Sequence, residues 1–106
     1  MKKITQEELN TILSDHEIWL KDPTKGKRAD LNNMDLTGLY LNKVNLKDAN
    51  CENTNLKDAN LRGANFYGAN LEGANFKNAN CQNANFEGAD LRGANFYGAN
   101  CKDADF

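Results

Sequence analysis

The side chains of this chain that could carry out chemistry are few. One histidine, His16, and three cysteines, at positions 51, 81 and 101, are the residues that most readily act as general base, nucleophile or soft metal ligand. The cysteines are separated by multiples of ten residues, which is not a metal-site spacing, and their odd number fits a reducing compartment better than a disulfide framework. Catalysis also needs such groups to be held together in a cleft. We therefore expect no enzyme activity and no cofactor.

Oxygen ligands are more numerous, because asparagine or aspartate recurs throughout residues 29–106. A calcium site needs about six to eight oxygens in one loop, whereas these residues occur singly at regular intervals. We expect their side chains to accept hydrogen bonds from the backbone of turns and to form ladders along a face, and we expect no metal site.

The regular intervals come from a five-residue repeat, Ala-(Asn/Asp)-(Leu/Phe/Cys)-x-(Gly/Asn/Asp), which runs sixteen times from Ala29 to Phe106 without an insertion. We call its third, apolar position the centre of the repeat. The residue two places before the centre is alanine in twelve of the sixteen repeats. Side chains alternate along a strand, so the centre and this alanine point to the same side. An α-helix is excluded, because an apolar residue every five positions drifts around a helix.

Each repeat also predicts a turn. The position two after the centre is glycine, asparagine or aspartate in every repeat except the one with Lys43, and these residues best tolerate positive φ. A type II turn, or a similar one, would bend the chain by roughly a right angle, so that about four repeats close one coil.

Stacking of such coils at a period of twenty residues predicts four inward ladders. The phenylalanines should stack ring on ring at the ~4.8 Å spacing of neighbouring strands. Cys81 and Cys101 would be neighbours with parallel side chains, a geometry that resists a disulfide. The ladders are Leu31, Cys51, Leu71 and Leu91; Leu36, Leu56, Phe76 and Phe96; Leu41, Leu61, Cys81 and Cys101; and Leu46, Phe66, Phe86 and Phe106.

This repeat resembles that of the pentapeptide-repeat family, whose consensus A-(D/N)-L-x-x is carried here by 78 of 106 residues. The resemblance implies an all-β solenoid, a right-handed quadrilateral parallel β-helix of about four coils. Within one domain overall, residues 1–28 would form a helical cap and linker and residues 29–106 the β-helix.

Residues 4–22 predict a short α-helix that covers the first coil. Thr5 and Glu8 have the spacing of a capping box. The sequence is compatible both with one continuous helix and with a helix that is broken near Ser14. The face expected to lie on the coil consists of Leu9, Ile12, Leu13, His16, Trp19 and Leu20.

The same stretch also looks like the leader that precedes the repeats in some bacterial and phage members of the family. His16 and Trp19 could be read as a binding pair. A cap histidine beside a tryptophan that seals the coil is the favoured interpretation.

Charge and hydropathy limit the partners. The net charge of −2 divides into +1 for residues 1–28 and −3 for residues 29–106, too little to recruit nucleic acid or an anionic membrane. No apolar run reaches the ~18 residues that span a bilayer, and the start of the chain turns acidic where a signal peptide would turn apolar. We expect a cytoplasmic protein with no membrane partner and no direct nucleic-acid binding.

We therefore expect a non-enzymatic structural or protein-protein interaction module whose partner is unidentified. An acidic strip is expected on the face of Leu31, where Asp30, Glu52, Glu72 and Asp90 stand against Arg92. The candidate partner surface is Glu52 and Glu72 of this strip with the outward Tyr67 and Tyr97, since aromatic residues often anchor interfaces. The two tyrosines are thirty residues apart, or one and a half coils, which places them on opposite faces.

The alternative function comes from the resemblance, because the best-known family members mimic B-DNA and bind DNA gyrase, a topoisomerase, in quinolone resistance. Duplex DNA carries about 12 negative charges over ~20 Å, the expected length of this rod. The repeats carry −3 in total, and the gyrase-directed members are longer. This composition favours the generic module.

The last coil would expose its apolar centres and a set of unpaired strand edges, which a soluble monomer normally hides. We expect either homodimerisation through this coil, as in some family members, or a natural chain that continues beyond Phe106.

Overall fold

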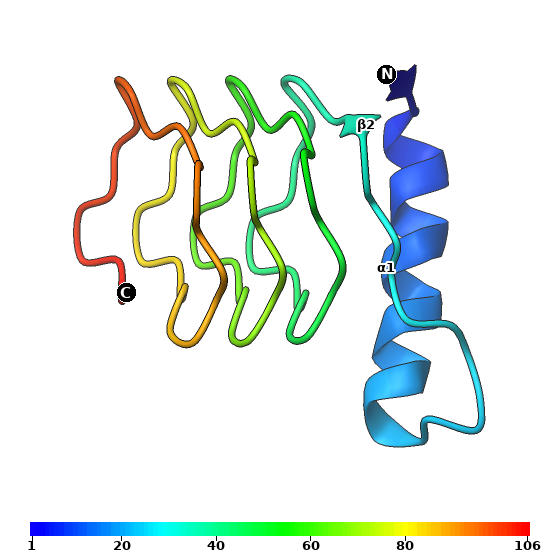
Figure 1. Cartoon of the computed structure of the whole chain (residues 1–106). Helices are drawn as coiled ribbons and strands as arrows, with labels where there is room; N and C mark the ends of the chain where they lie inside the picture. The colour runs from blue at the N-terminus through cyan, green and yellow to red at the C-terminus, as the bar shows by residue number, and fades with distance from the viewer.

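Residues twenty positions apart pair in parallel and wind the chain into a solenoid with a helix across one end (Figure 1). The computed structural model describes residues 1–106. Its regular elements are strand β1 (Lys2–Lys3), helix α1 (Gln6–Lys21) and strand β2 (Met34–Asp35). Isolated parallel bridges, such as Asp30 with Asn50 and Asn50 with Asn70, connect the rest. Below, residues 29–48 are called the first coil and residues 89–106 the last coil.

Two backbone hydrogen bonds form each bridge. The N–H of Asn50 donates to the Ala29 carbonyl across 3.0 Å, and the N–H of Leu31 donates to the Asn50 carbonyl across 2.8 Å. The residue before each centre thus turns both of its backbone groups toward the preceding coil, which fixes the register at twenty residues.

The turns predicted in every repeat are confirmed. All fifteen positions that follow a centre by two residues have positive φ, between 56° and 72°, including Lys43 at 60°. The N–H of the next residue donates to the carbonyl of the centre, as Met34 does to Leu31 across 3.1 Å. These are the features of a type II turn, so the glycine, asparagine and aspartate choices have a direct conformational cause.

The asparagines before the centres bind the turn backbone, as expected. The Oδ1 of Asn65 accepts from the N–H of Tyr67 across 2.9 Å, and most repeats carry the same bond. Asn50 is an exception, because the N–H of Glu52 donates to Asn32 Oδ1 at 2.8 Å. The Oδ1 of Asn50 is therefore buried without a hydrogen-bond partner.

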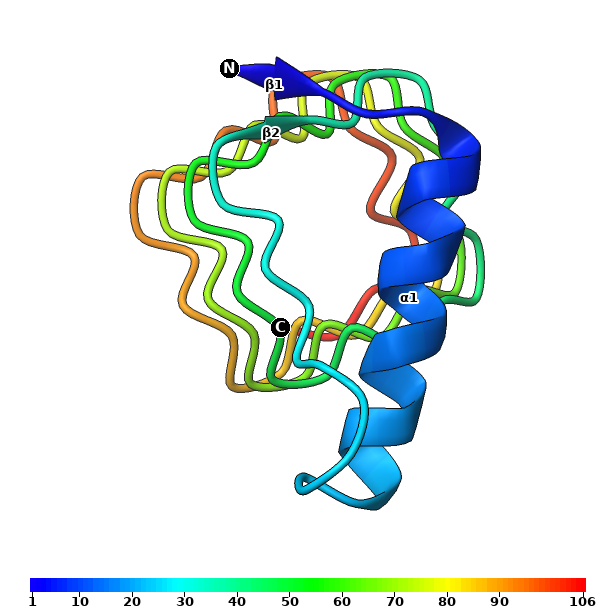
Figure 2. The same cartoon turned by 90° about the vertical axis from the view of Figure 1, so that its right-hand side faces the viewer.

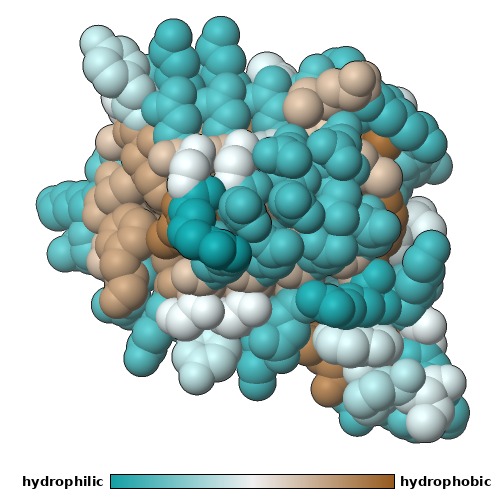
Figure 3. Space-filling model, in the orientation of Figure 1, coloured by the Kyte–Doolittle hydropathy of each residue, from teal (hydrophilic) through white to brown (hydrophobic).

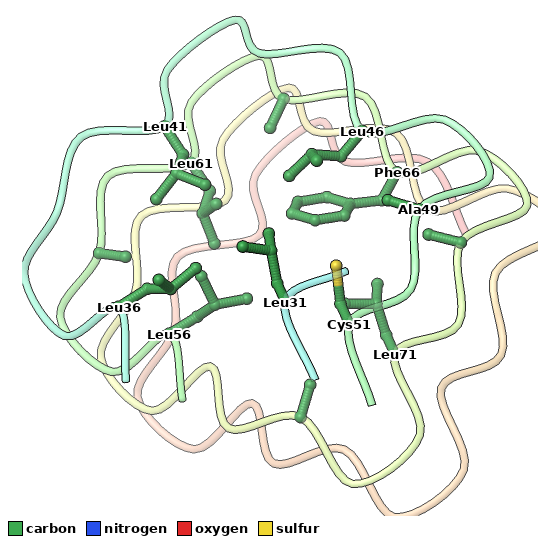
Figure 4. Close-up of a cluster of buried hydrophobic side chains, with 14 of the residues drawn as sticks. Leu31, Leu36, Leu41, Leu46, Ala49, Cys51, Leu56, Leu61, Phe66 and Leu71 are labelled. Carbon is green, nitrogen blue, oxygen red and sulfur yellow. The ribbon is translucent and has the colours of Figure 1, made fainter. Parts of the chain in front are cut away.

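The core is the interior of the coils, where the centres point toward one another (Figure 4). The predicted ring stacking is present. Phe66 and Phe86 are parallel with centroids 5.4 Å apart, and Phe76 and Phe96 are parallel at 4.5 Å. The two columns meet edge to face, as between Phe76 and Phe86 at 87°. Each such pair adds about 0.5–1.5 kcal/mol beyond the buried area.

The cysteines lie among these centres and are free thiols. Cys51 and Cys81 are buried, and Cys101 is half-buried. Burial raises the pKa of Cys51 and of Cys81 to about 12. Both therefore stay protonated near neutral pH, and a protonated thiol is a poor nucleophile and a poor metal ligand.

The last coil is less buried than the others. Leu91, Phe96 and Cys101 are half-buried, and Phe106 is 63% exposed. Apolar side chains accordingly gather at the left end of the surface in Figure 3, the end farthest from α1 in Figure 1.

Helix α1 is continuous from Gln6 to Lys21, with no break at Ser14. The predicted capping box is present: Glu8 N–H donates to Thr5 Oγ1, and Thr5 N–H donates to Glu8 Oε1, both across 3.0 Å. The helix crosses the open end of the first coil, while β1 runs beside β2 (Figure 2). It is neither long enough nor apolar enough to cross a bilayer.

Candidate functional site

His16 lies at the centre of the contact between α1 and the first coil. Its side chain is fully buried, with 0% exposed surface. Nε2 lies 2.8 Å from the Lys47 carbonyl, and Nδ1 accepts from the Ala29 N–H across 2.9 Å. These partners require the neutral tautomer with its proton on Nε2. One ring thereby joins the beginning of the first coil to its end.

The electrostatics of His16 agree with a structural role. Burial is the main reason why its pKa is lowered, and the positive charge of Arg28 acts in the same direction. The ring of Trp19 stacks on the imidazole, with centroids 5.5 Å apart, and the Arg28 guanidinium lies 5.9 Å from the Trp19 ring centroid. Both nitrogens of His16 are occupied, so the ring has no free atom for a ligand.

The other residues of the predicted cap face differ in burial. Leu9 is fully buried, whereas the remaining four are half-buried. These four residues are Ile12, Leu13, Trp19 and Leu20.

Gln6 is a second cap residue, and sequence reasoning missed it. Its Nε2 donates to the Tyr40 carbonyl and its Oε1 accepts from the Tyr40 N–H, each across 2.9 Å. The side-chain amide thus occupies the place of a neighbouring strand. β1 does the same for Asp35 through its backbone. A glutamine in the first turn of a helix and a two-residue strand leave no periodic signal that could have revealed either contact.

Two edges of the first coil have no such cover. The backbone N–H and C=O of Asp30 and of Asn45 make no hydrogen bond within the protein. Each residue lines one of the two surface grooves. The Asp30 groove has a volume of about 190 Å³ and is lined by Ile12, Asp15, Lys27, Arg28, Ala29, Asp30 and Met34. The Asn45 groove has a volume of about 200 Å³ and is lined by Glu17, Leu20, Lys21 and Asn45.

Both grooves are small. Typical small-molecule pockets are about 300–1,000 Å³, larger than both grooves. No three side chains of histidine, cysteine, aspartate or glutamate lie close enough together to hold a metal ion. The chemistry that the grooves offer is backbone hydrogen bonding beside apolar and charged side chains.

The acidic strip contains a positive charge. Arg92 Nη2 lies 2.7 Å from Asp90 Oδ2 and 3.4 Å from Glu72 Oε2. The hydrogen bonds from Arg92 lower the pKa of Asp90. Such exposed ion pairs contribute little to stability, about 0–1 kcal/mol. Arg92 thus offsets the charge of Glu72 and Asp90, and Asp30 and Glu52, which make no ion pair, are the unneutralised residues of the strip.

Tyr67 and Tyr97 are both exposed, at 44% and 75%. Each ring lies over a lysine one coil earlier: Lys47 Nζ is 5.8 Å from the Tyr67 centroid, and Lys77 Nζ is 5.9 Å from the Tyr97 centroid. These lysines belong to different ladders, so the tyrosines do not form one patch. Each tyrosine instead pairs with a cation on its own face.

Comparison with known proteins agrees with this geometry. A model of pentapeptide repeats matches residues 27–63, 40–78 and 74–106, in eight copies. Among solved structures, the chain is similar to the pentapeptide repeat protein Rfr23 from the cyanobacterium Cyanothece 51142. Their sequences are 32% identical, the TM-score is 0.50, and the match covers 77% of this chain and 67% of Rfr23.

Two further structures are similar at lower TM-scores. A pentapeptide repeat protein from the thylakoid lumen of Arabidopsis thaliana is 31% identical, with a TM-score of 0.47; the match covers 71% of this chain and 48% of that one. QnrB1, a plasmid-mediated fluoroquinolone resistance protein, is 17% identical, with a TM-score of 0.41, and the match covers 79% of this chain and 53% of that one. None of the curated proteins matches the chain.

Proposed function

Since the chain belongs to the pentapeptide-repeat family, we propose that it is a non-enzymatic scaffold whose outer side chains bind a protein partner. The observation that carries this proposal is the division of each repeat: inward residues fill the core and the turn residues hold positive φ, which leaves the outward positions to vary. In this proposal residues 29–106 form a right-handed quadrilateral β-helix of about four coils, and residues 1–28 cap it. The free thiols support a reducing, cytoplasmic location.

The proposed partner surface lies on two consecutive turns that carry Tyr67 and Glu72, together with Glu52 one coil before Glu72. An exposed aromatic ring beside unneutralised carboxylate is suited to a partner with basic side chains. Tyr97, which lies on another ladder, would contribute to a separate contact.

The test is an affinity pull-down from the source cell with two variants of equal net charge. E52Q/E72Q removes two negative charges and N42K/Q82K adds two positive charges, so each raises the net charge by two, but on different faces. We expect E52Q/E72Q to weaken the captured partner's affinity about tenfold, which corresponds to about 1.4 kcal/mol, and N42K/Q82K to leave it unchanged. Equal binding of the partner to the wild type and to both variants would exclude this surface.

The last coil is the proposed contact between two copies of the chain. Its support is the half-buried Leu91 and Phe96, the exposed Phe106 and the backbone N–H groups of Leu91 and Phe96, which lack partners. Sedimentation equilibrium at ~100 µM should then show a dimer, and F106D should shift it toward monomer. A wild-type monomer at that concentration would contradict the proposal.

The alternative is a DNA-mimicking inhibitor of gyrase. Its support is membership of the family, whereas the repeats' net charge of −3 and the presence of Arg92 in the acidic strip weigh against it. A gyrase supercoiling assay with excess protein decides between the two, because a DNA mimic inhibits the enzyme and a generic scaffold does not.

A further inference from the structure

The first coil has four residues whose backbone groups point away from the second coil. They occupy the positions equivalent to Asn50, which binds the preceding coil through both its N–H and its C=O. They differ in what covers them. Asp35 faces β1 and Tyr40 faces the Gln6 amide, whereas Asp30 and Asn45 face no hydrogen-bond partner.

The two uncovered residues coincide with the two grooves of the protein. Because unpaired backbone groups that are shielded from water are costly, an open edge must meet solvent or a partner. The Asp30 groove has the more varied lining of the two. Ile12, Ala29 and Met34 are apolar, and Lys27 and Asp15 carry charges of opposite sign. The groove lies between α1 and the first coil, and its lining residue Met34 belongs to β2, which pairs with β1.

The partners of the Tyr40 and Asp35 edges indicate which kind of group would bind the Asp30 edge. At Tyr40 the partner is an amide, with a C=O for the N–H and an N–H for the C=O. At Asp35 it is a backbone strand. The volume of about 190 Å³ equals about six water molecules, too little for most metabolites but enough for small side chains of a strand.

We propose that the Asp30 groove binds an extended segment of a partner protein, which adds one short strand to the first coil next to β1. The Asp30 N–H would donate to a carbonyl of that segment, and the Asp30 carbonyl would accept from its N–H, as Asn50 does with Ala29 and Leu31. In the bound segment, the two residues that flank the residue opposite Asp30 would point toward Ile12 and Met34, which line the groove. The segment therefore carries small apolar residues at alternate positions. This inference rests on the proposed function as a protein-binding scaffold.

The experiment uses a library of seven-residue peptides displayed on phage and selected against the full chain. Binding of the selected peptides is then measured with three variants. D30P removes the N–H that the strand would use, which makes no bond in the free protein, but it also removes the Oδ1 that accepts from the Asn32 N–H. D30N keeps both the N–H and the side-chain acceptor, and D30A, which keeps the N–H but loses the acceptor, separates the two effects. We expect the peptides to bind wild type and D30N equally and D30P at least tenfold more weakly. Amide exchange at Asp30 should slow on binding, while exchange at Asn50 should not change.

A second arm changes only the peptide, so it holds even if D30P fails to fold. Methylation of the peptide nitrogen that donates to the Asp30 carbonyl should abolish binding, whereas methylation of the next nitrogen should not. Three outcomes would overturn the proposal. The selection could enrich no peptide, or the peptides could bind D30P as tightly as wild type. The peptides could also tolerate every N-methylation but lose binding when an asparagine or glutamine is replaced. Glu52 and Glu72 do not line the groove. A partner that is lost in E52Q/E72Q and peptides that are lost in D30P therefore report on separate sites.

Discussion

His16 and Ala29 are joined by a hydrogen bond in which the Ala29 N–H donates to Nδ1 of the imidazole across 2.9 Å. The opposite nitrogen donates to the Lys47 carbonyl at 2.8 Å. A neutral ring satisfies both partners, whereas a proton on Nδ1 would face the Ala29 N–H. Helix α1 is therefore held on the first coil by a group that loses one of its two bonds when it is protonated.

The first prediction is that the fold loses stability as the pH falls from about 7 to about 5. Burial lowers the pKa of folded His16 below the ~6.5 of the unfolded chain, so the unfolded state binds more protons between the two values. The contribution of neutral His16 to the free energy of unfolding is therefore complete above pH ~6.5. It declines as the pH falls through this window, by at most about 1.4 kcal/mol per pH unit. Urea unfolding at half-unit pH steps measures it.

Three charged side chains act on His16 in addition to burial. Arg28 lowers the pKa of the imidazole and Asp48 and Glu17 raise it, but burial is the largest effect and the pKa is lowered. The control is H16Q, which should remove the slope and cost about 1–3 kcal/mol at neutral pH through the unpaired Ala29 N–H. A wild-type free energy of unfolding that does not change between pH 7 and pH 5 would refute the coupling.

The second prediction concerns Gly26, where the linker packs against α1. Its φ is +64°, and a Cβ at this position would lie 2.8 Å from the backbone nitrogen of Trp19. G26A should therefore lower the free energy of unfolding by about 2–4 kcal/mol, from the left-handed conformation and the clash together. G38A is the matched control, since its φ is +71° with no atom within 4 Å, and it should cost about 1–2 kcal/mol. Equal losses in the two variants would show that the close approach has no effect.

The third prediction tests the side-chain amide that covers Tyr40. Q6A should lower the free energy of unfolding by about 1–3 kcal/mol, because the two hydrogen bonds to Tyr40 and the one to Asn10 are lost and no strand replaces them. E7A changes the adjacent exposed residue and serves as the control. Hydrogen exchange provides a local measurement, since the Tyr40 amide should exchange faster in Q6A alone. Unchanged exchange at Tyr40 would mean that Gln6 does not protect this edge.

The fourth prediction compares two residues of the same asparagine position. N65A removes the acceptor of the Tyr67 N–H and should cost about 1 kcal/mol. N50A removes an Oδ1 that is buried without a partner, so it should be neutral or stabilising. Thermal unfolding of the two variants under identical conditions measures the difference. A larger loss for N50A than for N65A would indicate a partner for Asn50 that the structure does not show.

The fifth prediction follows the phenylalanine columns. Phe86 is buried and contacts four other rings, whereas Phe106 is 63% exposed. At a concentration where the chain is monomeric, F86A should therefore cost about 3–5 kcal/mol and F106A less than about 1.5 kcal/mol. Denaturant titration of both variants at that concentration gives the values. Similar losses there would contradict the difference in burial between the two rings.

The repeats could be predicted from the sequence because one local rule is applied at every coil. Each Gly, Asn or Asp after a centre and each Asn before it acts within three residues, so the φ values and turn bonds follow from position alone. The cap helix was likewise readable from its capping box. The position of His16 on the face that covers the first coil was predicted as well. The contacts of Gln6 and β1 and the two hydrogen-bond partners of His16 were not, because each occurs once and joins residues 13 to 34 positions apart.

The twenty-residue pairing has a consequence for how the surface can evolve. A whole five-residue repeat can be gained or lost without changing the backbone bonds, yet every later outward side chain then moves by a quarter of a coil. The identical ten-residue segments at 61–70 and 91–100, which carry Tyr67 and Tyr97 on separate ladders, illustrate this. Copying in steps other than twenty residues thus redistributes surface chemistry around the rod while the backbone pairing remains the same.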